Sequence, residues 1–399
     1  MVIVGAGECG TRAALALREA GYAGPVTLVG AEPHPPYERP PLSKEGMLGG
    51  VLAKAIAGAG GLAEAGIDFR PGAVATAIDR GGRAVILVGG GRLAYERLLI
   101  ATGARARALP VPVAEGARLA TLRGLDDAAR IRGALGPGKR LAVIGGGFIG
   151  LELAAAARGL GAEVTVIEAL PRLLGRCVPA EIAAVVEARH REEGVALLLG
   201  ARVAAVSGEG VELAGGGRVA ADLVVAGVGA VPDTALAAAA GLAVADGIAV
   251  DARLATEDPA IFAAGDCCSF PHPRYGHRRV RLESWRSAQE QGALAARNML
   301  GQEESVSAVP WFWSDQYDLT LQVAGLAEGA ASEVRRPLAG GAFVVFHLAA
   351  DGGLLAASGI GRGNVVARDI RLAEMLIARD ARPDPGALGD PSVNLRKLL

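Results

Sequence analysis

Cysteine is scarce in this chain, and its spacing excludes one kind of chemistry. The 399 residues contain four cysteines, Cys9, Cys177, Cys267 and Cys268, and no two of them form a C-x-x-C or C-x4-C pair. The sequence therefore lacks the signature of a paired-thiol redox centre. The adjacent Cys267 and Cys268 leave a strained vicinal disulfide open, although two separate thiols are the expectation in a reducing compartment.

Strong net charge, long apolar runs and metal-ligand spacing are missing as well. The formal net charge is -1, so the chain has no general attraction for nucleic acid or an anionic membrane. No uninterrupted run of about 18 strongly apolar residues occurs, so we predict no membrane span. The five histidines show no ligand spacing, and no metal site is predicted. No basic leader precedes the first predicted strand, and we expect a cytoplasmic protein.

Two glycine-rich motifs of the form G-x-G-x-x-G carry most of the information that is present. Their glycines are Gly5, Gly7 and Gly10 in the first motif and Gly145, Gly147 and Gly150 in the second. Each motif follows a short β-branched run and precedes an Ala-rich stretch that is typical of a helix. An acidic residue, Glu32 or Glu168, follows about 20 positions later. With this context the motifs predict two dinucleotide sites, and two dinucleotides suggest that one passes electrons to the other.

The order of predicted elements indicates an α/β fold with two Rossmann-like dinucleotide-binding domains and a small α+β C-terminal domain. The first domain is expected to be discontinuous, in residues 1–108 and 241–312, with the second in 109–240 and the C-terminal domain in 313–399. The main predicted helices are Thr11–Ala20, Phe148–Leu160, Ala180–Glu193, Ser287–Leu300 and Ala367–Arg379. The Pro-rich segment Pro33–Pro41 is expected to run extended, because proline opposes a helix interior.

Three further segments carry a resemblance to a known family. They are Pro36–Lys44, Ile261–Asp266 and the Trp-rich Pro310–Asp318. Together, in this order, they resemble the FAD-dependent ferredoxin reductases of bacterial oxygenase systems. These are putidaredoxin-reductase-like flavoproteins of the glutathione-reductase superfamily, related to apoptosis-inducing factor. The resemblance covers essentially the whole chain, and the Trp-Phe-Trp-Ser-Asp-Gln segment is its most specific part.

The resemblance implies FAD on the first glycine motif and NADH on the second. The residues that it assigns to FAD are Gly5, Gly7, Gly10, Glu32, Arg39, Lys44, Val74, Thr102, Gly103, Arg123, Gly265, Asp266, Glu283, Trp285 and Trp313. Those assigned to NADH are Gly145, Gly147, Phe148, Ile149, Gly150, Glu168, Arg176 and Gly229. The resemblance also gives catalytic roles to Lys44, beside the flavin, and to Glu152, which faces the nicotinamide and pairs with that lysine.

Glu168 predicts NADH rather than NADPH. A carboxylate at the end of the second strand accepts a hydrogen bond from a ribose 2′-hydroxyl and repels a 2′-phosphate. At about 4 Å and an effective dielectric near 20, that repulsion is on the order of 4 kcal/mol. Arg172 and Arg176 lie close in sequence and either soften this repulsion or serve as ordinary surface charge.

The absent cysteine pair bears on where the electrons go. Cys9 lies in the glycine loop without a partner, so it is expected to pack as a small buried thiol. The family likeness then implies that NADH passes electrons through FAD to a [2Fe–2S] ferredoxin, which feeds a cytochrome P450 or a ring-hydroxylating dioxygenase. Arg274, Arg278, Arg279 and Arg281 form a basic cluster that either steers an acidic ferredoxin or is a solvated face.

Other functions stay open at this point. An NADH oxidase or a rubredoxin reductase would use the same two cofactors with another acceptor. A non-catalytic NADH-responsive interaction protein is a further alternative, with slow turnover and NADH-driven dimerisation. The expected state is a monomer or a homodimer.

Overall fold

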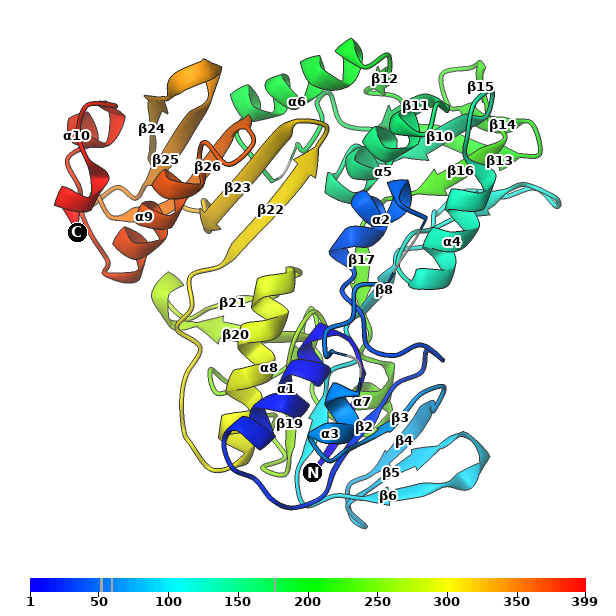
Figure 1. Ribbon diagram of the computed structural model, residues 1–399, viewed down its shortest axis with the longest axis vertical. Helices are drawn as coiled ribbons and strands as arrows, with labels where there is room; N and C mark the ends of the chain where they lie inside the picture. Colours follow the sequence, from blue (N-terminus) through cyan, green and yellow to red (C-terminus); the bar gives the residue numbers. More distant parts are fainter. Residues whose placement is uncertain (51–52, 59, 176) are drawn as a thin grey trace. The chain divides into compact units, whose positions relative to one another are not determined.

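A computed structural model describes residues 1–50, 53–58, 60–175 and 177–399 (Figure 1). Arg176, one of the residues assigned to NADH, lies outside the described residues. The chain forms two compact units. Unit 1 comprises Met1–Arg39, Ala53–Arg105 and Ala230–Ala308, and unit 2 comprises Pro40–Leu52, Ala106–Gly229 and Val309–Leu399.

Unit 1 is built on a five-stranded parallel sheet in the order β19-β7-β1-β2-β3. Its strands are β1 (Val2–Val4), β2 (Val26–Val29), β3 (Ile67–Arg70), β7 (Leu98–Ile100) and β19 (Ile261–Ala263). The strands β1, β7 and β19 are buried along their whole length, as expected for parallel strands that are covered on both faces. The carboxyl ends of these three neighbours therefore share one edge of the sheet.

Helices and smaller sheets complete unit 1. The helices are α1 (Glu8–Glu19), α3 (Gly61–Glu64), α7 (Ala235–Ala239) and α8 (Trp285–Met299), with 3-10 turns η2 (Val88–Gly90) and η3 (Pro273–Tyr275). The additional strands are β4 (Ala75–Asp79), β5 (Ala84–Leu87), β6 (Arg92–Ala94), β8 (Ala104–Ala106), β17 (Ala230–Pro232), β18 (Ile248–Ala249), β20 (Cys268–His272) and β21 (Arg278–Val280). Helices α1 and α8 pack closely, because Gly292 of α8 has no side chain that would overlap the Cys9 carbonyl of α1.

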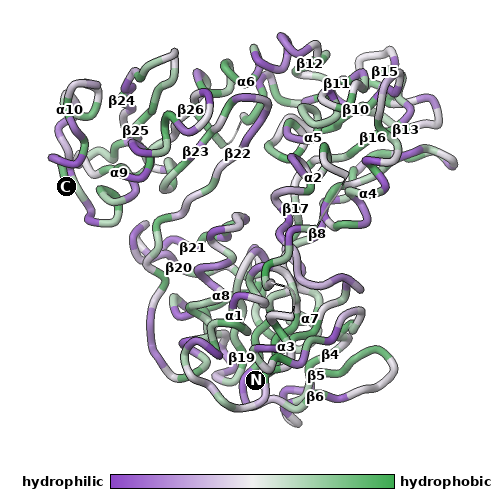
Figure 2. Tube along the Cα trace, in the orientation of Figure 1, coloured by the Kyte–Doolittle hydropathy of each residue, from purple (hydrophilic) through white to green (hydrophobic). Residues whose placement is uncertain are grey.

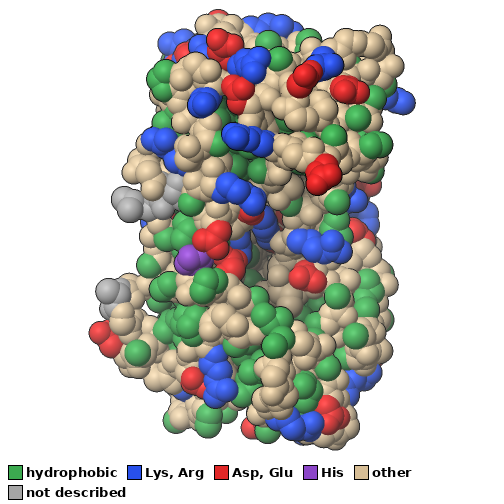
Figure 3. Space-filling view, turned by 90° about the vertical axis from the view of Figure 1, so that its right-hand side faces the viewer, with side chains coloured by type: hydrophobic (Ala, Val, Ile, Leu, Met, Phe, Trp, Pro, Cys, Tyr) green, Lys and Arg blue, Asp and Glu red, His purple; other side chains and the backbone are tan. Residues whose placement is uncertain are grey.

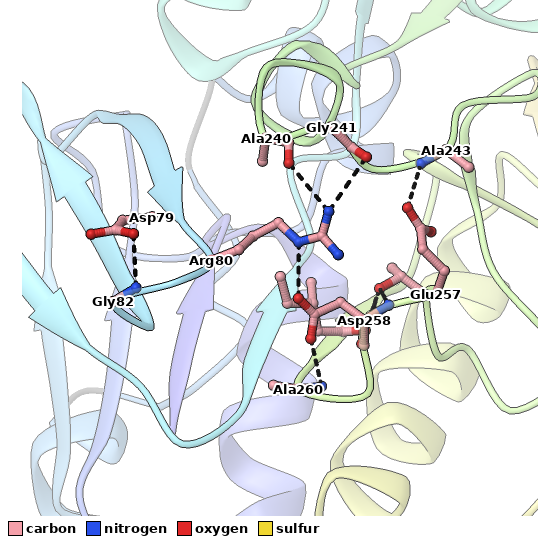
Figure 4. Close-up of polar contacts among 11 residues, drawn as sticks. Asp79, Arg80, Gly82, Ala240, Gly241, Ala243, Glu257, Asp258 and Ala260 are labelled. Carbon is pink, nitrogen blue, oxygen red and sulfur yellow. Dashed lines mark hydrogen bonds and ion pairs between the residues drawn. The ribbon is translucent and has the colours of Figure 1, made fainter.

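Arg80 joins two of the three stretches of sequence that make up unit 1, Ala53–Arg105 and Ala230–Ala308 (Figure 4). Its Nε donates to Asp258 Oδ2 at 2.9 Å, and its Nη1 lies 3.5 Å from the carbonyl oxygens of Ala240 and Gly241. Burial alone would raise the pKa of Asp258, but the hydrogen bond from Arg80 lowers it, and the pKa lies below its usual value. The carboxylate is therefore ionised at neutral pH and secures the returning segment.

Unit 2 contains a second five-stranded parallel sheet, in the order β12-β11-β10-β16-β9. Its strands are β9 (Leu119–Ala120), β10 (Arg140–Ile144), β11 (Glu163–Glu168), β12 (Ala196–Leu199) and β16 (Leu223–Ala226). The associated elements are η1 (Pro40–Ser43), α2 (Glu45–Leu48), α4 (Leu125–Ala134), α5 (Phe148–Gly159), α6 (Ala180–Glu192), β13 (Val203–Ser207), β14 (Gly210–Leu213) and β15 (Arg218–Ala220). Helix α5 is mostly hydrophobic, whereas α6 carries more polar residues (Figure 2).

The C-terminal part of unit 2 is an antiparallel sheet in the order β22-β23-β26-β25-β24. Its elements are β22 (Trp311–Gln316), β23 (Leu319–Gly325), β24 (Ser332–Pro337), η4 (Ala339–Gly341), β25 (Phe343–Leu348), β26 (Leu354–Arg362), α9 (Ala367–Ala378), α10 (Pro385–Gly389) and η5 (Leu395–Leu398). Helix α9 packs on β23 and β26 around Phe346, Ile370 and Leu376.

The buried Arg336 of β24 holds the last residues of the chain. Its guanidinium pairs with Asp369 at 2.9 Å and donates to the carbonyl oxygens of Asp390 at 2.6 Å and Val393 at 2.8 Å. One side chain thereby satisfies several carbonyls that no strand or helix pairs.

The α/β fold predicted from the sequence is confirmed. The strand predicted at Glu163–Glu168 is β11, with the same bounds, and the five main helices differ from prediction by three residues or fewer at each end. The extended course predicted for Pro33–Pro41 is wrong at its end, where Pro40 and Pro41 begin the 3-10 helix η1. Proline is tolerated in a first helical turn, because the N–H that it lacks has no partner there.

Candidate functional site

The first glycine motif forms a cradle that fits a pyrophosphate. Gly5 has φ +112°, and a Cβ on it would overlap the carbonyl of Ala101. A Cβ on Gly10 would overlap the carbonyl of Gly5, whereas Gly7 faces open space. These are the three tasks of the fingerprint: a tight turn, close approach of a ligand, and close helix packing. Gly7 at the start of α1 also supplies no capping side chain, so the first N–H groups of the helix remain for an anion.

Glu32 is fixed by two neighbours beyond the end of β2. Its Oε1 lies 2.6 Å from Arg39 Nη2, and its Oε2 accepts a 2.5 Å hydrogen bond from Tyr37. Burial would raise the pKa of Glu32, but Arg39 and Tyr37 lower it below its usual value. The result is an ionised, oriented carboxylate, suited to accept from ribose hydroxyls.

Five other residues assigned to FAD come from two of the three stretches of sequence in unit 1. Thr102 and Gly103 follow β7, and Gly265 and Asp266 follow β19, so they share the sheet edge with the first glycine motif. Val74 lies apart in sequence, directly before β4, with 42% of its surface exposed. The structure therefore gathers four of these five residues at one edge and leaves the role of Val74 a prediction.

Glu8 is a functional candidate that the sequence reasoning missed. Its carboxylate accepts hydrogen bonds from the indole of Trp285 at 3.0 Å and from Gln289 at 2.7 Å. Burial raises the pKa of Glu8 despite these donors. Glu8 thereby positions Trp285, which the family likeness places near the flavin. The only signal in the sequence was an acid in a glycine loop, where helix charge alone explains it.

The basic cluster near Trp285 is partly occupied within unit 1. Arg279 donates to the Ser269 carbonyl, and Arg281 pairs with Asp246 and Glu283. On the face drawn in Figure 3, basic and acidic side chains are interspersed rather than gathered by sign. The partners of Arg279 and Arg281 within unit 1 count against a role of these two arginines in steering a ferredoxin.

The second glycine motif repeats the first in unit 2. A Cβ on Gly145 would overlap the carbonyl of Gly227, and one on Gly150 would overlap the carbonyl of Gly145. Gly147 faces open space, as Gly7 does. Gly229, with φ +109°, follows β16 and lies at the same sheet edge as the motif. The residues present thus fit a second dinucleotide.

Glu168 is tied to this glycine motif. Its Oε2 accepts from the Gly146 N–H and its Oε1 from the Leu170 N–H, both at 2.7 Å. Lone pairs remain on both oxygens for a ribose diol. Arg172 donates hydrogen bonds to the carbonyls of Gly175 and Val178 rather than to Glu168. It therefore stabilises the loop that follows β11.

Three more predicted residues of unit 2 lie near helix ends. Phe148 begins α5 and packs edge-to-face on Phe312, with ring centroids 5.1 Å apart. Ile149 follows it and is 48% exposed. Arg123 precedes α4, and its backbone N–H donates to Asp127.

Lys44 and Glu152 meet in the interior of unit 2, as the family likeness implied. Lys44 Nζ lies 3.5 Å from Glu152 Oε1, 3.7 Å from Asp315 Oδ2 and 4.6 Å from the ring centroid of Trp313. Ser43, which the sequence reasoning missed, donates to Glu152 Oε2 at 2.5 Å. Burial raises the pKa of Glu152, although Lys44 and the hydroxyls oppose it. Glu152 therefore takes up a proton more readily than an ordinary glutamate.

The four cysteines form no disulfide bond in the part of the chain that the structure describes. All four cysteines are free, and Cys9, Cys267 and Cys268 are buried. Burial raises the pKa of each of these three thiols. They are therefore poor nucleophiles, as expected for Cys9, and the alternative of a vicinal disulfide is not realised.

Among the described residues, no group of three or more His, Cys, Asp or Glu side chains is arranged to hold a metal ion. Within the same part of the chain, no helix has the length and apolar character needed to cross a membrane.

Comparison with known proteins decides the family. Residues 1–292 match the model described as pyridine nucleotide-disulphide oxidoreductase, and residues 311–399 match the reductase C-terminal model. The chain belongs to this family. It is an oxidoreductase with FAD and NADH as its cofactors, and the residues of both glycine cradles fit them.

Several relatives cover the whole chain. The chain is 44% identical over 405 residues to the ferredoxin–NAD(+) reductase component of the anthranilate 1,2-dioxygenase system of Burkholderia cepacia, covering 100% of this chain and 98% of that protein. It is 38% identical to the putidaredoxin reductase of Pseudomonas putida, with 100% and 96% covered. Putidaredoxin reductase in its covalent complex with putidaredoxin superposes with a TM-score of 0.93 at 36% identity, covering 100% of this chain and 97% of that one.

Proposed function

We propose that this protein is an NADH:ferredoxin reductase that passes electrons from NADH through FAD to a [2Fe–2S] ferredoxin. The observation that carries the proposal is the pair of glycine cradles, each with its own acidic residue, in a chain whose buried thiols are inert. FAD, when bound, takes up a hydride from NADH and can release the electrons one at a time.

The residues have separate tasks in this proposal. Residues 1–108 and 241–312 hold FAD, with Gly7 and the start of α1 on its pyrophosphate and Glu32 on a ribose. Residues 109–240 hold NADH, with Gly147 on its pyrophosphate and Glu168 on the adenosine ribose. Residues 313–399 form the C-terminal domain, to which Trp313 belongs.

Lys44 and Glu152 orient the reacting groups rather than move a proton in the hydride step. Lys44 supplies a compact positive charge, since its Nζ is held by Glu152, Asp315 and the face of Trp313. Glu152, held by Ser43 and Lys44, presents a carboxyl group to the nicotinamide. Both side chains are buried, so their interactions with bound cofactors are weakly screened.

The relatives named above support the acceptor. The Burkholderia relative belongs to a dioxygenase system, and the ferredoxin reductase of the CYP199A2 system of Rhodopseudomonas palustris superposes with a TM-score of 0.93 at 37% identity, covering 99% and 98% of the two chains. We therefore propose that the ferredoxin feeds an oxygenase of one of these two kinds. We further propose that the protein works in the cytoplasm as a monomer or homodimer.

Stopped-flow kinetics of the holoenzyme tests this function. NADH should bleach the flavin absorbance, and cytochrome c reduction should accelerate many-fold when a [2Fe–2S] ferredoxin is added. Fast NADH consumption with oxygen alone, unchanged by ferredoxin, would favour the oxidase. Bleaching that is slow and followed by dimerisation would favour the interaction protein.

A further inference from the structure

A buried run of polar side chains leads away from Glu152 through the interior of unit 2. Side chains alternate across β22, so Ser314 and Gln316 share one face, opposite Trp313 and Asp315. Ser314 is 1% exposed and Gln316 4%, although both are polar. Polar groups this deeply buried are stable only when they are hydrogen-bonded.

The partners form one continuous chain, which we call the Glu152 chain. Ser314 Oγ donates to Glu152 Oε1 at 2.6 Å, and Gln316 Nε2 donates to Ser314 Oγ at 3.1 Å. Gln316 Oε1 lies 2.8 Å from Nε2 of His190, a fully buried side chain of α6. His190 Nδ1 lies 3.2 Å from the Tyr317 hydroxyl, which ends the chain.

The donors of the Glu152 chain all point the same way when Glu152 is ionised. The carboxylate can only accept, so Ser314 donates to it and must receive from the Gln316 amide nitrogen. The Gln316 oxygen then needs a proton from His190 Nε2. A neutral imidazole with its proton on Nε2 accepts at Nδ1, which matches the Tyr317 hydroxyl.

Protonation of Glu152 on Oε1, the oxygen that faces Ser314, reverses every one of these assignments. A carboxyl O–H on Oε1 donates to Ser314, whose own O–H must then turn to Gln316. Rotation of the Gln316 amide presents its oxygen to Ser314 and its nitrogen to His190 Nε2. Nε2 of His190 must now accept a hydrogen bond from the Gln316 amide. The His190 ring proton therefore lies on Nδ1 and points to Tyr317.

We infer that the Glu152 chain is a two-state device in which the protonation of Glu152 selects the ring tautomer of His190. Ser314, Gln316 and His190 are thus positioning residues for the acid of the proposed nicotinamide site. The inference rests on the proposed function only in the role that it gives to Glu152. The two states differ by one proton, which comes from solvent and ends on Glu152. His190 exchanges its ring proton when the partly exposed Tyr317 end opens.

The charges around both ends fit such a device. The carboxyl group of Glu152 lies beside the ammonium group of Lys44, which also contacts Asp315. The hydroxyls of Ser43 and Ser314 donate to the two oxygens of Glu152. His190 stands next to Arg189 and near Glu193, and burial lowers its pKa, which keeps the ring neutral. Near Tyr317 lie Glu193, Arg158 and Arg189, and burial raises its pKa, which keeps the hydroxyl protonated. Glu152 is therefore the member of the chain that changes charge.

Two spectroscopic signals follow the two ends independently. In the holoenzyme, the carboxyl C=O stretch, identified by its absence in Glu152→Gln, reports the protonation of Glu152. The ¹⁵N shifts of the His190 ring nitrogens report its tautomer. In a pH titration the two signals should change with the same midpoint. A tautomer that stays constant while Glu152 titrates, or a Glu152 band that never changes while the fold persists, overturns the inference.

Variants separate coupling from simple damage. Gln316→Leu should abolish the tautomer change while Glu152 continues to titrate. Ser314→Ala interrupts the Glu152 chain at a second position and removes only a hydroxyl group, and the same result is expected. Ser43→Ala is the matched control, because Ser43 donates to Glu152 from outside the chain. It should raise the midpoint of Glu152, with His190 still following. None of these measurements needs ferredoxin or turnover, so a failure of this inference is distinguishable from a failure of the proposed function.

Discussion

The ammonium group of Lys44 lies 3.5 Å from Oε1 of Glu152, and the two side chains are only 10% and 7% exposed. They come from segments more than a hundred residues apart in the sequence. A pair this deeply buried is held in one geometry, since neither group can find water to replace its partner.

Lys44→Met should extend to higher pH the range over which stability falls as pH rises. The folded-state pKa of Glu152 is already raised, so the folded protein binds an extra proton and loses stability as pH rises from the unfolded toward the folded pKa. Without Lys44 that pKa rises further and the loss continues to higher pH. Denaturant titrations at several pH values measure the effect. It should vanish in Lys44→Met/Glu152→Gln, and Lys54→Met, at an exposed lysine, should leave the pH slope unchanged.

Gly147→Ala should impair NADH binding without unfolding unit 2. A Cβ at Gly147 would have no atom within 4 Å, so the expected loss of stability is at most about 1 kcal/mol. The KM for NADH should rise about tenfold or more, because the methyl occupies the space that the pyrophosphate needs. Gly150→Ala is the contrasting variant: its Cβ would overlap the Gly145 carbonyl, and about 1–3 kcal/mol of stability should be lost. An unchanged KM in Gly147→Ala would remove the motif from NADH binding.

Glu168→Ala should shift coenzyme preference toward NADPH. Removing the carboxylate ends its repulsion of a 2′-phosphate, and the ratio of kcat/KM for NADPH over NADH should rise by about tenfold or more. NADH itself should bind less well, since Glu168 also holds the Gly146 N–H. Glu163→Ala, at the exposed opposite end of β11, is the control. An unaltered ratio would mean that another group reads the ribose.

Arg336→Met should destabilise the C-terminal sheet by about 3–5 kcal/mol. The substitution leaves the largely buried Asp369 without its partner and removes the guanidinium donors of the Asp390 and Val393 carbonyls. Chemical denaturation measures the loss, and limited proteolysis should cut near the C-terminus. Arg335→Met, on the exposed face of the same strand, should cost about 1 kcal/mol or less.

Thiol titration should find one reactive cysteine in the native protein. Cys177 is exposed, whereas Cys9, Cys267 and Cys268 are buried with raised pKa values. A thiol reagent should modify one group before unfolding and four after it. Cys177→Ser should abolish the fast reaction. A second fast thiol, or inactivation by mild peroxide, would contradict the inert role assigned to Cys9.

The sequence predicted the parts of the fold that depend on local pattern. The strands predicted at Val26–Val29 and Glu163–Glu168 are β2 and β11, because each βαβ unit contains a glycine turn and a β-branched strand whose signals lie within about 30 residues. The pairing of Lys44 with Glu152 came from the family likeness and not from any local pattern. The small antiparallel sheets, such as β4–β6 and β13–β15, were missed because their strands are short and half-exposed.

The hydrogen-bond partners of the site could not be predicted in the same way. Ser43 and Ser314 both bind Glu152, yet a serine carries no sequence signal for a partner more than a hundred positions away. Glu8 and Trp285 meet only because α1 and α8 pack together. Such contacts depend on tertiary packing, which fixes side-chain direction after the elements have formed.

The pairing of β19 with β7 and the packing of α8 on α1 set an order for biosynthesis. The first glycine motif emerges from the ribosome well before the strand and helix that complete its unit, because β19 and α8 are encoded some 250 residues later. At about 5–20 residues per second, the nascent N-terminal segment waits on the order of ten seconds or more for its partners. The second sheet has every one of its strands within residues 119–226 and is available to fold during that interval. The sheet that is begun first is therefore completed after the second sheet, and flavin capture is expected only once β19 and α8 have been made.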